Sequence, residues 1–173
     1  MAISFEENSC LLVIDIQTDY TYVHDFDKFR NNIKLLLKQA RKTNVPIIFM
    51  FEIDNEKSKW IPFWEELHGK RIRDKGIPLS FSKPRENEKV FIKHGFDSFF
   101  KTSLQTYLQS LNIKTIYFSG VLTGSCVLNT MFTSYNNGYR NILISNCCSD
   151  KNKKRHDDTI KNYKNYLFIE KQI

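Results

Sequence analysis

The stretch CLLVIDI, at residues 10–16, decides the fold class of this chain. It is apolar on both faces and contains β-branched residues, which is typical of a central strand in a parallel sheet. Similar apolar runs recur along the chain, and amphipathic segments separate them. The expected strands are 10–16, 45–51, 89–93, 115–120, 141–145 and 166–170, and the expected helices are 26–43, 101–111, 127–135 and 157–166. This alternation predicts an α/β fold, an open and mostly parallel sheet of about six strands with helices on both faces.

Length and composition narrow the class of protein. A chain of 173 residues with 41% hydrophobic residues suits one globular domain, which we place at residues 1–173. The net charge of +7 permits binding to nucleic acid, but the one dense basic cluster, at 151–155, contains no aromatic residues. No signal peptide precedes the first strand, and no apolar run is long enough to cross a membrane. We therefore expect a cytoplasmic protein that binds neither nucleic acid nor membranes.

Three chemically unusual residues are expected at one edge of the sheet. Asp15 lies inside the first apolar run, Lys93 closes the third expected strand, and Cys126 lies at a strand-to-helix turn in GVLTGSCV. Ligands of parallel sheets bind beyond the carboxyl ends of the strands, so we expect these side chains to converge. A helix N-terminus and a nearby ammonium both favour the nucleophilic thiolate of a cysteine. Burial should raise the pKa of Asp15, which would allow it to accept the thiol proton.

Each of these residues also has a purely structural interpretation. A free cysteine is commonly buried, a lysine at a strand end is ordinarily solvated, and an Asp–Lys pair would satisfy a buried carboxylate without catalysis. Position alone leaves both interpretations open. The histidines and cysteines show no metal-ligand spacing, and the glycines do not form a dinucleotide fingerprint. We therefore expect neither a metal nor an organic cofactor.

The connection at residues 52–82 interrupts the strand–helix alternation. It contains both tryptophans, Trp60 and Trp64, and it is long for a connection, which is typical of functional or mobile segments. The tryptophans could line a pocket or fix the connection to the body, and Phe96 could belong to the core or to a ligand pocket. We expect this segment to cap the pocket and to set specificity.

Three motifs, in order along the chain, resemble those of the isochorismatase-like cysteine hydrolase family. LLVIDIQTDY, at residues 11–20, is similar to an apolar strand that ends in D-x-Q-x-D-F. KHGFDSFFKTSL, at 93–104, is similar to K-x-x-Y-S-A-F-x-x-T-x-L. GVLTGSCVLNTMFTSYNNGY, at 120–139, is similar to G-V-x-T-x-x-C-V followed by T, A and G-Y, with the alanine replaced here. The motifs span most of the chain and form a specific signal.

This resemblance implies a three-layer α/β/α, Rossmann-like fold and a catalytic triad of Asp15, Lys93 and Cys126. It also implies a cis peptide bond between Val121 and Leu122, with the amides of Leu122 and Cys126 as the oxyanion hole. Attack by Cys126 on an amide carbon would release ammonia or an amine and leave a thioester, which water would hydrolyse with Asp15 as base. The residues that we expect to contact the substrate are Gln17, Tyr20, Trp64, Phe96 and Thr123.

Departures from the family pattern indicate which reaction to expect. Nicotinamidases of this family place a metal site built on D-x-H after the second strand, where this chain reads FEIDN at residues 51–55, so a metal-dependent nicotinamidase is disfavoured. Siderophore-pathway isochorismatases carry glycine where this chain has Cys126, so the cysteine favours thioester chemistry on a C–N bond. Gly124 stands where many relatives carry a polar residue, which leaves the substrate contacts near the turn open.

The sequence therefore predicts a metal-independent amidohydrolase that acts on a small amide or carbamoyl compound. One alternative in the same fold is hydrolysis of a vinyl ether, as in isochorismatases. Another is a catalytically idle relative that serves as a binding protein. Because members of the family are commonly oligomers, we expect a homodimer or a larger homo-oligomer whose partner is a small-molecule substrate.

Overall fold

The computed structural model describes residues 3–71 and 75–173, and within them six parallel strands form one sheet. The strands lie in the order β3-β2-β1-β4-β5-β6. They are β1 (Ser9–Ile14), β2 (Ile47–Glu52), β3 (Lys89–Lys93), β4 (Thr115–Val121), β5 (Arg140–Ser149) and β6 (Ile169–Lys171). The order changes direction at β1, since the chain first builds toward β3 and later toward β6. Sheets of this kind bind ligands beyond the carboxyl ends of their strands at such a reversal.

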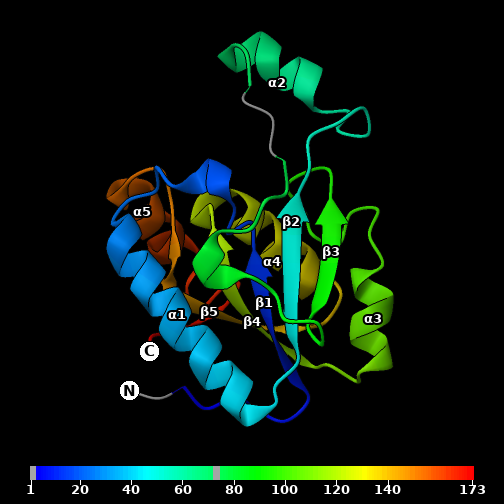
Figure 1. Ribbon diagram of the computed structural model, residues 1–173, viewed down its shortest axis with the longest axis vertical. Helices are drawn as coiled ribbons and strands as arrows, with labels where there is room; N and C mark the ends of the chain where they lie inside the picture. Colours follow the sequence, from blue (N-terminus) through cyan, green and yellow to red (C-terminus); the bar gives the residue numbers. More distant parts are fainter. Residues whose placement is uncertain (1–2, 72–74) are drawn as a thin grey trace.

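Helices cover both faces of the sheet (Figure 1). They are α1 (Phe26–Thr43), α2 (Ile61–His68), α3 (Leu104–Ser110), α4 (Leu128–Asn136) and α5 (Lys153–Tyr163), with short helical turns η1 (Thr18–Tyr20), η2 (Ser80–Ser82) and η3 (Thr123–Val127). Alternate residues of β1 enter opposite cores. Leu11 and Val13 pack in the core that α1 covers, whereas Leu12 and Ile14 pack in the core that α3 and α4 cover. These three layers confirm the predicted fold class.

The strand β4 passes close to β1 before it reaches the η3 turn. Gly120 has φ +118°, and a Cβ built at this position would lie 2.0 Å from the carbonyl oxygen of Ile14. Only glycine has both the freedom to adopt this φ and the space for this approach. Asp15 also leaves β1 with φ +52°, which is why the strand ends at Ile14 rather than at residue 16. Both features bring the ends of β1 and β4 together.

Three further differences from the predicted elements concern α2, α5 and the last strand. The connection at residues 52–82 contains the helix α2, which stands away from the body of the molecule (Figure 1). The helix α5 begins at Lys153 rather than at residue 157, because the side chain of Asn152 accepts a hydrogen bond from the amide of Arg155 and caps the helix. The last strand is shorter and later than predicted, at Ile169–Lys171. Among the described residues, no helix combines the length and apolarity needed to span a membrane.

Candidate active site

Four ionisable side chains meet at the carboxyl edge of the sheet. Asp15 follows β1, Glu52 ends β2, Lys93 ends β3, and Cys126 lies in the η3 turn that follows β4. The Nζ atom of Lys93 lies 2.8 Å from Oδ2 of Asp15 and 3.5 Å from Sγ of Cys126. All four residues are buried, with Cys126 the most accessible at 2%. The fold thus brings together the three residues that the sequence singled out.

Glu52 is the member of this cluster that the sequence analysis did not assign. Its Oε2 atom lies 3.3 Å from Nζ of Lys93 and 3.7 Å from Sγ of Cys126, and it accepts a hydrogen bond of 3.3 Å from the hydroxyl of Tyr20. A signal for this residue was present, since Glu52 closes an otherwise apolar strand just as Lys93 does. The sequence pattern at residues 51–55 was interpreted only as the absence of the D-x-H metal motif, and Glu52 received no role there.

The side chain of Gln17 fixes the backbone that carries Glu52. Its Nε2 donates to the carbonyl of Glu52 at 3.0 Å, and its Oε1 accepts from the amide of Glu52 at 2.7 Å. Gln17 is fully buried and contacts the site through this pair of bonds. Of the residues expected to contact the substrate, Gln17 and Tyr20 therefore both hold Glu52.

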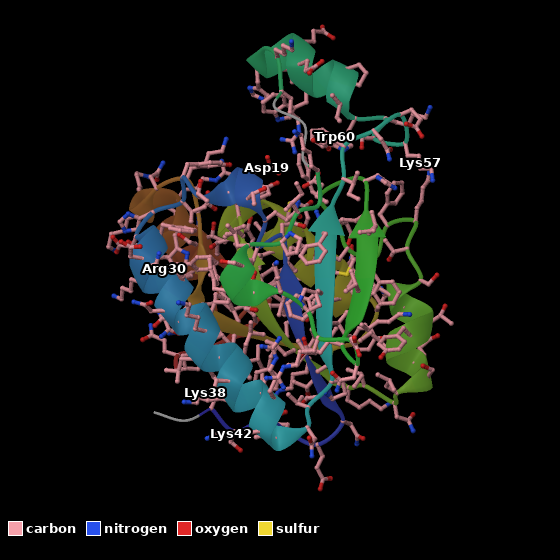
Figure 2. All side chains as sticks on the ribbon, viewed as in Figure 1. Asp19, Arg30, Lys38, Lys42, Lys57 and Trp60 are labelled. Atoms are coloured by element: carbon pink, nitrogen blue, oxygen red, sulfur yellow. The ribbon has the colours of Figure 1, made fainter. Side chains whose placement is uncertain are left out.

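The other three expected substrate residues lie at two different places. Thr123 begins the η3 turn, where its hydroxyl lies 3.0 Å from the carbonyl of Ser149 and 2.8 Å from Nδ1 of His156. Phe96 packs against Trp60 with tilted rings whose centroids are 4.5 Å apart. Trp60 lies where the α2 segment, residues 54–71, joins the body (Figure 2). Trp64 is on α2 itself, and its ring centroid lies 5.6 Å from the guanidinium carbon of Arg71.

An arginine connects the α2 segment to the cluster. The guanidinium of Arg71 lies 4.8 Å from the ring centroid of Trp60 and pairs with Asp54 at 2.8 Å. Its Nη2 atom lies 3.7 Å from Oε1 of Glu52. Trp60 in turn donates from its indole to the carbonyl of His94 at 3.0 Å. The segment thus reaches the site through Arg71 and rests on the end of β3 through Trp60.

Burial dominates the protonation of the cluster. It raises the pKa of Asp15 to about 6, with the charge of Lys93 opposing this rise and that of Glu52 adding to it. Burial alone would lower the pKa of Lys93, but Asp15, Cys126 and Glu52 together raise it above its ordinary value, so the ammonium stays charged. The predicted rise of the Asp15 pKa is therefore confirmed.

The expectation that a helix N-terminus and Lys93 shift Cys126 toward its thiolate is wrong. Burial raises the pKa of Cys126 well above its usual range, and the nearby Asp15 and Glu52 add to this effect against the opposing charge of Lys93. The η3 turn is also not the start of a regular helix, because Gly124 has non-helical backbone angles. Cys126 is therefore a neutral thiol, and it would have to lose a proton to a neighbouring group before it could act as a nucleophile.

The turn that carries Cys126 is held by Asp150, which follows β5, and by Arg155 of α5. The peptide bond between Val121 and Leu122 is cis, as the resemblance implies. The amide of Gly124 donates to Oδ2 of Asp150 at 2.6 Å, and Arg155 donates from Nη2 to the carbonyl of Gly124 at 3.1 Å. Arg155 and Asp150 are themselves paired at 2.9 Å. The assignment of the Leu122 and Cys126 amides to an oxyanion hole stays a prediction.

The cluster does not suit a metal ion. Asp15, Glu52 and Cys126 offer ligand atoms that lie within 4.8 Å of one another. All three atoms surround Nζ of Lys93, which also donates to the carbonyl of Gly95 at 2.9 Å. The ammonium already occupies the centre of this ligand set and supplies its positive charge, so a cation would have to displace it.

The fold and this cluster define a Rossmann-like α/β protein with a buried cysteine, lysine and carboxylates at the edge of its sheet. The model of the Isochorismatase domain matches residues 9–169, and the chain belongs to that family.

Known proteins agree with this assignment. The chain is 28% identical over 146 residues to an uncharacterized isochorismatase family protein of Bacillus subtilis, YddQ, a match that covers 82% of this chain and 77% of the relative. The structure of an isochorismatase-like hydrolase from Alkaliphilus metalliredigens superposes with a TM-score of 0.82 at 18% identity, over 95% of this chain and 94% of that one. N-carbamoylsarcosine amidase from Thermoplasma acidophilum gives a TM-score of 0.79 at 18% identity, over 95% of each chain.

Proposed function

We propose that this chain is a metal-independent cysteine hydrolase that cleaves the C–N bond of a small amide or carbamoyl compound through a thioester. One observation carries the proposal: the Lys93 ammonium lies 3.5 Å from the Cys126 sulfur and 2.8 Å from the Asp15 carboxylate. Membership in the isochorismatase family supports a hydrolase, and the likeness to N-carbamoylsarcosine amidase supports the choice of a C–N bond.

The first half-reaction would form the thioester. Asp15 accepts the thiol proton while the sulfur of Cys126 attacks the carbonyl carbon, which suits a carboxylate whose pKa is raised to about 6. Lys93 keeps its proton and stabilises the negative charge that develops on sulfur. The amides of Leu122 and Cys126 would donate to the oxygen of the tetrahedral intermediate. Asp15 then returns its proton to the nitrogen, the C–N bond breaks, and ammonia or an amine leaves.

The second half-reaction would release the acid. A water molecule in the place of the departed amine gives a proton to Asp15 and attacks the thioester carbon. The C–S bond breaks, the sulfur of Cys126 recovers a proton from Asp15, and the carboxylic or carbamic acid leaves. The resting thiol and carboxylate are restored.

Replacement of the nucleophile tests the proposal. We expect Cys126→Ala to lower kcat for ammonia release from a panel of small amides and carbamoyl compounds by at least about a thousandfold, since the covalent route is lost. Cys148→Ala, which removes another buried free cysteine, is the matched control and should retain activity. Turnover at the wild-type rate in the Cys126 variant would refute the mechanism and point to hydrolysis without a thioester.

A binding protein without turnover is the second candidate function. The raised pKa and the burial of Cys126 favour it, because both lower the reactivity of the thiol. It predicts that no compound of the amide panel is hydrolysed, although the folded protein binds some of them. Binding measured by calorimetry beside the hydrolysis screen separates the two candidates.

A further inference from the structure

The side chain of Glu52 is aimed into the cluster by a rigid backbone. Its Cα is paired with that of Lys93 in the β2–β3 ladder, and Gln17 holds its amide and carbonyl from the other side. The carboxylate is fully buried, and its Oε2 atom lies 3.7 Å from the sulfur that would attack the substrate. Glu52 is therefore next to the reacting atoms.

The two oxygens of Glu52 have different surroundings. Oε2 is near Lys93, Tyr20 and Cys126, as described above. Among the described residues, no donor forms a hydrogen bond with Oε1, and Nη2 of Arg71 lies 3.7 Å from it. A buried carboxylate oxygen without a donor is costly, and such a group calls for a partner that is present only in the complex.

The charge balance indicates what kind of partner fits. Asp15 and Glu52 place two carboxylates against the single ammonium of Lys93, and Arg71 is shared with Asp54 at 2.8 Å. A carboxylate on the substrate would add a third negative group to this buried site. An N–H group would instead supply the donor that Oε1 lacks, in a charge-assisted hydrogen bond.

We propose that Glu52 is a further catalytic residue that accepts an N–H hydrogen bond from the substrate. It selects neutral or cationic compounds with N–H groups, such as primary carboxamides and ureido or carbamoyl compounds, over amides that carry a carboxylate. The inference rests on the proposed function, because it takes the Cys126 sulfur as the atom that meets the substrate.

Alkylation of Cys126 by three small reagents tests this selectivity without requiring turnover. Iodoacetamide carries N–H groups, N,N-dimethyl-2-iodoacetamide lacks them, and iodoacetate carries a negative charge. Rate constants at Cys126 are measured by site-resolved mass spectrometry and divided by those of glutathione. The ratio of two reagents at one thiol does not depend on the fraction of thiolate, so a change in the pKa of Cys126 cancels.

For each reagent we divide the rate constant at Cys126 by the rate constant with glutathione. In the wild-type protein we expect this quotient to be about tenfold larger for iodoacetamide than for either of the other two reagents, which is the scale of one hydrogen bond to a charged group. Glu52→Gln, which keeps the shape but removes the charge, should bring both ratios close to those of glutathione. Glu56→Gln, which removes a charge from an exposed position nearby, should leave both ratios as in the wild type.

Two outcomes would overturn the inference. Either both ratios survive the Glu52→Gln change, or only the iodoacetate ratio responds to it; neither is compatible with an N–H contact at Glu52. If the variant does not fold, the wild-type ratios alone decide, since values equal to those of glutathione contradict the selectivity. Loss of amide hydrolysis without loss of reagent selectivity would refute the proposed function but not the role of Glu52.

Discussion

Lys93 carries the positive charge around which the other groups of the site are arranged. Its ammonium lies within 3.5 Å of Asp15, Glu52 and Cys126, and all of these groups are buried. Burial raises the pKa of the Cys126 thiol, and the carboxylates of Asp15 and Glu52 add to this rise, so the thiol keeps its proton at rest. In the proposed reaction, activation of Cys126 is therefore a proton transfer within the cluster rather than a property of the free thiol.

The acid side of the pH profile should report the protonation of Asp15. Asp15 accepts the thiol proton only when ionised, and its pKa is about 6, so kcat/KM should fall as the pH decreases through that value. The charge of Glu52 raises this pKa, so Glu52→Gln should move the fall to lower pH. Steady-state rates between pH 4.5 and 8 on the best amide would measure both profiles. The same acid limb in the wild type and in Glu52→Gln would contradict the assignment of this limb to Asp15. Glu56→Gln, which removes a negative charge at an exposed position, is the control.

At the scale of the elements, the strands were predictable because burial on both faces leaves unbroken apolar runs. β1, β2 and β4 are buried along their whole length, and the apolar spacing of α1 matches the face that it buries. The helix α2 was not predictable in this way, because Phe63 and Leu67 are both exposed and no continuous apolar face marks it.

The candidate site was predictable in part for a related reason. The sequence places Asp15, Lys93 and Cys126 at strand ends, and parallel strands bring their carboxyl ends together. The role of Glu52 depends on its pairing with Lys93 across β2 and β3, which only the strand order reveals. The state of the thiol depends on tertiary burial, which a strand-end position does not predict.

Close packing of α5 on the η3 turn gives a prediction for Gly124. Its backbone angles, φ −88° and ψ 17°, suit any residue, but a Cβ would lie 2.7 Å from Oγ1 of Thr159 and 3.2 Å from Oδ2 of Asp150. Gly124→Ala should push α5 from the turn, lower the free energy of unfolding by about 1–3 kcal/mol, and reduce kcat because the Cys126 turn shifts. Urea unfolding and amide turnover provide the two measurements.

A second substitution isolates the cause of this effect. Thr159→Ala removes the nearest oxygen, so the double variant should recover part of both losses, which is favourable coupling in a double-mutant cycle. Additive losses would mean that the space beside Thr159 is not what requires glycine at position 124.

At the scale of the whole molecule, the body and the α2 segment are separable. The chain leaves the body after Ile53 and returns at Lys75, and these two residues form an antiparallel bridge. Neither hydrophobic core contains a residue from Asp54 to Arg71. The segment contacts the body through Trp60, which donates to the carbonyl of His94, and through Arg71, which lies near Glu52. It therefore borders the site and adds no residue to either core of the sheet.

This separation can be tested by excision. We expect a variant in which Asn-Gly replaces residues 54–74 to close as a tight hairpin turn between Ile53 and Lys75 and to keep one cooperative urea transition, because both cores stay intact. It should also lose the guanidinium near Glu52 and the ring that packs against Phe96. Since these groups border the site without touching Cys126, KM for the best amide should rise on the order of tenfold while kcat changes little. A variant that fails to fold would show that the body needs the segment for its stability. An unchanged KM would show that the segment does not contribute to substrate binding.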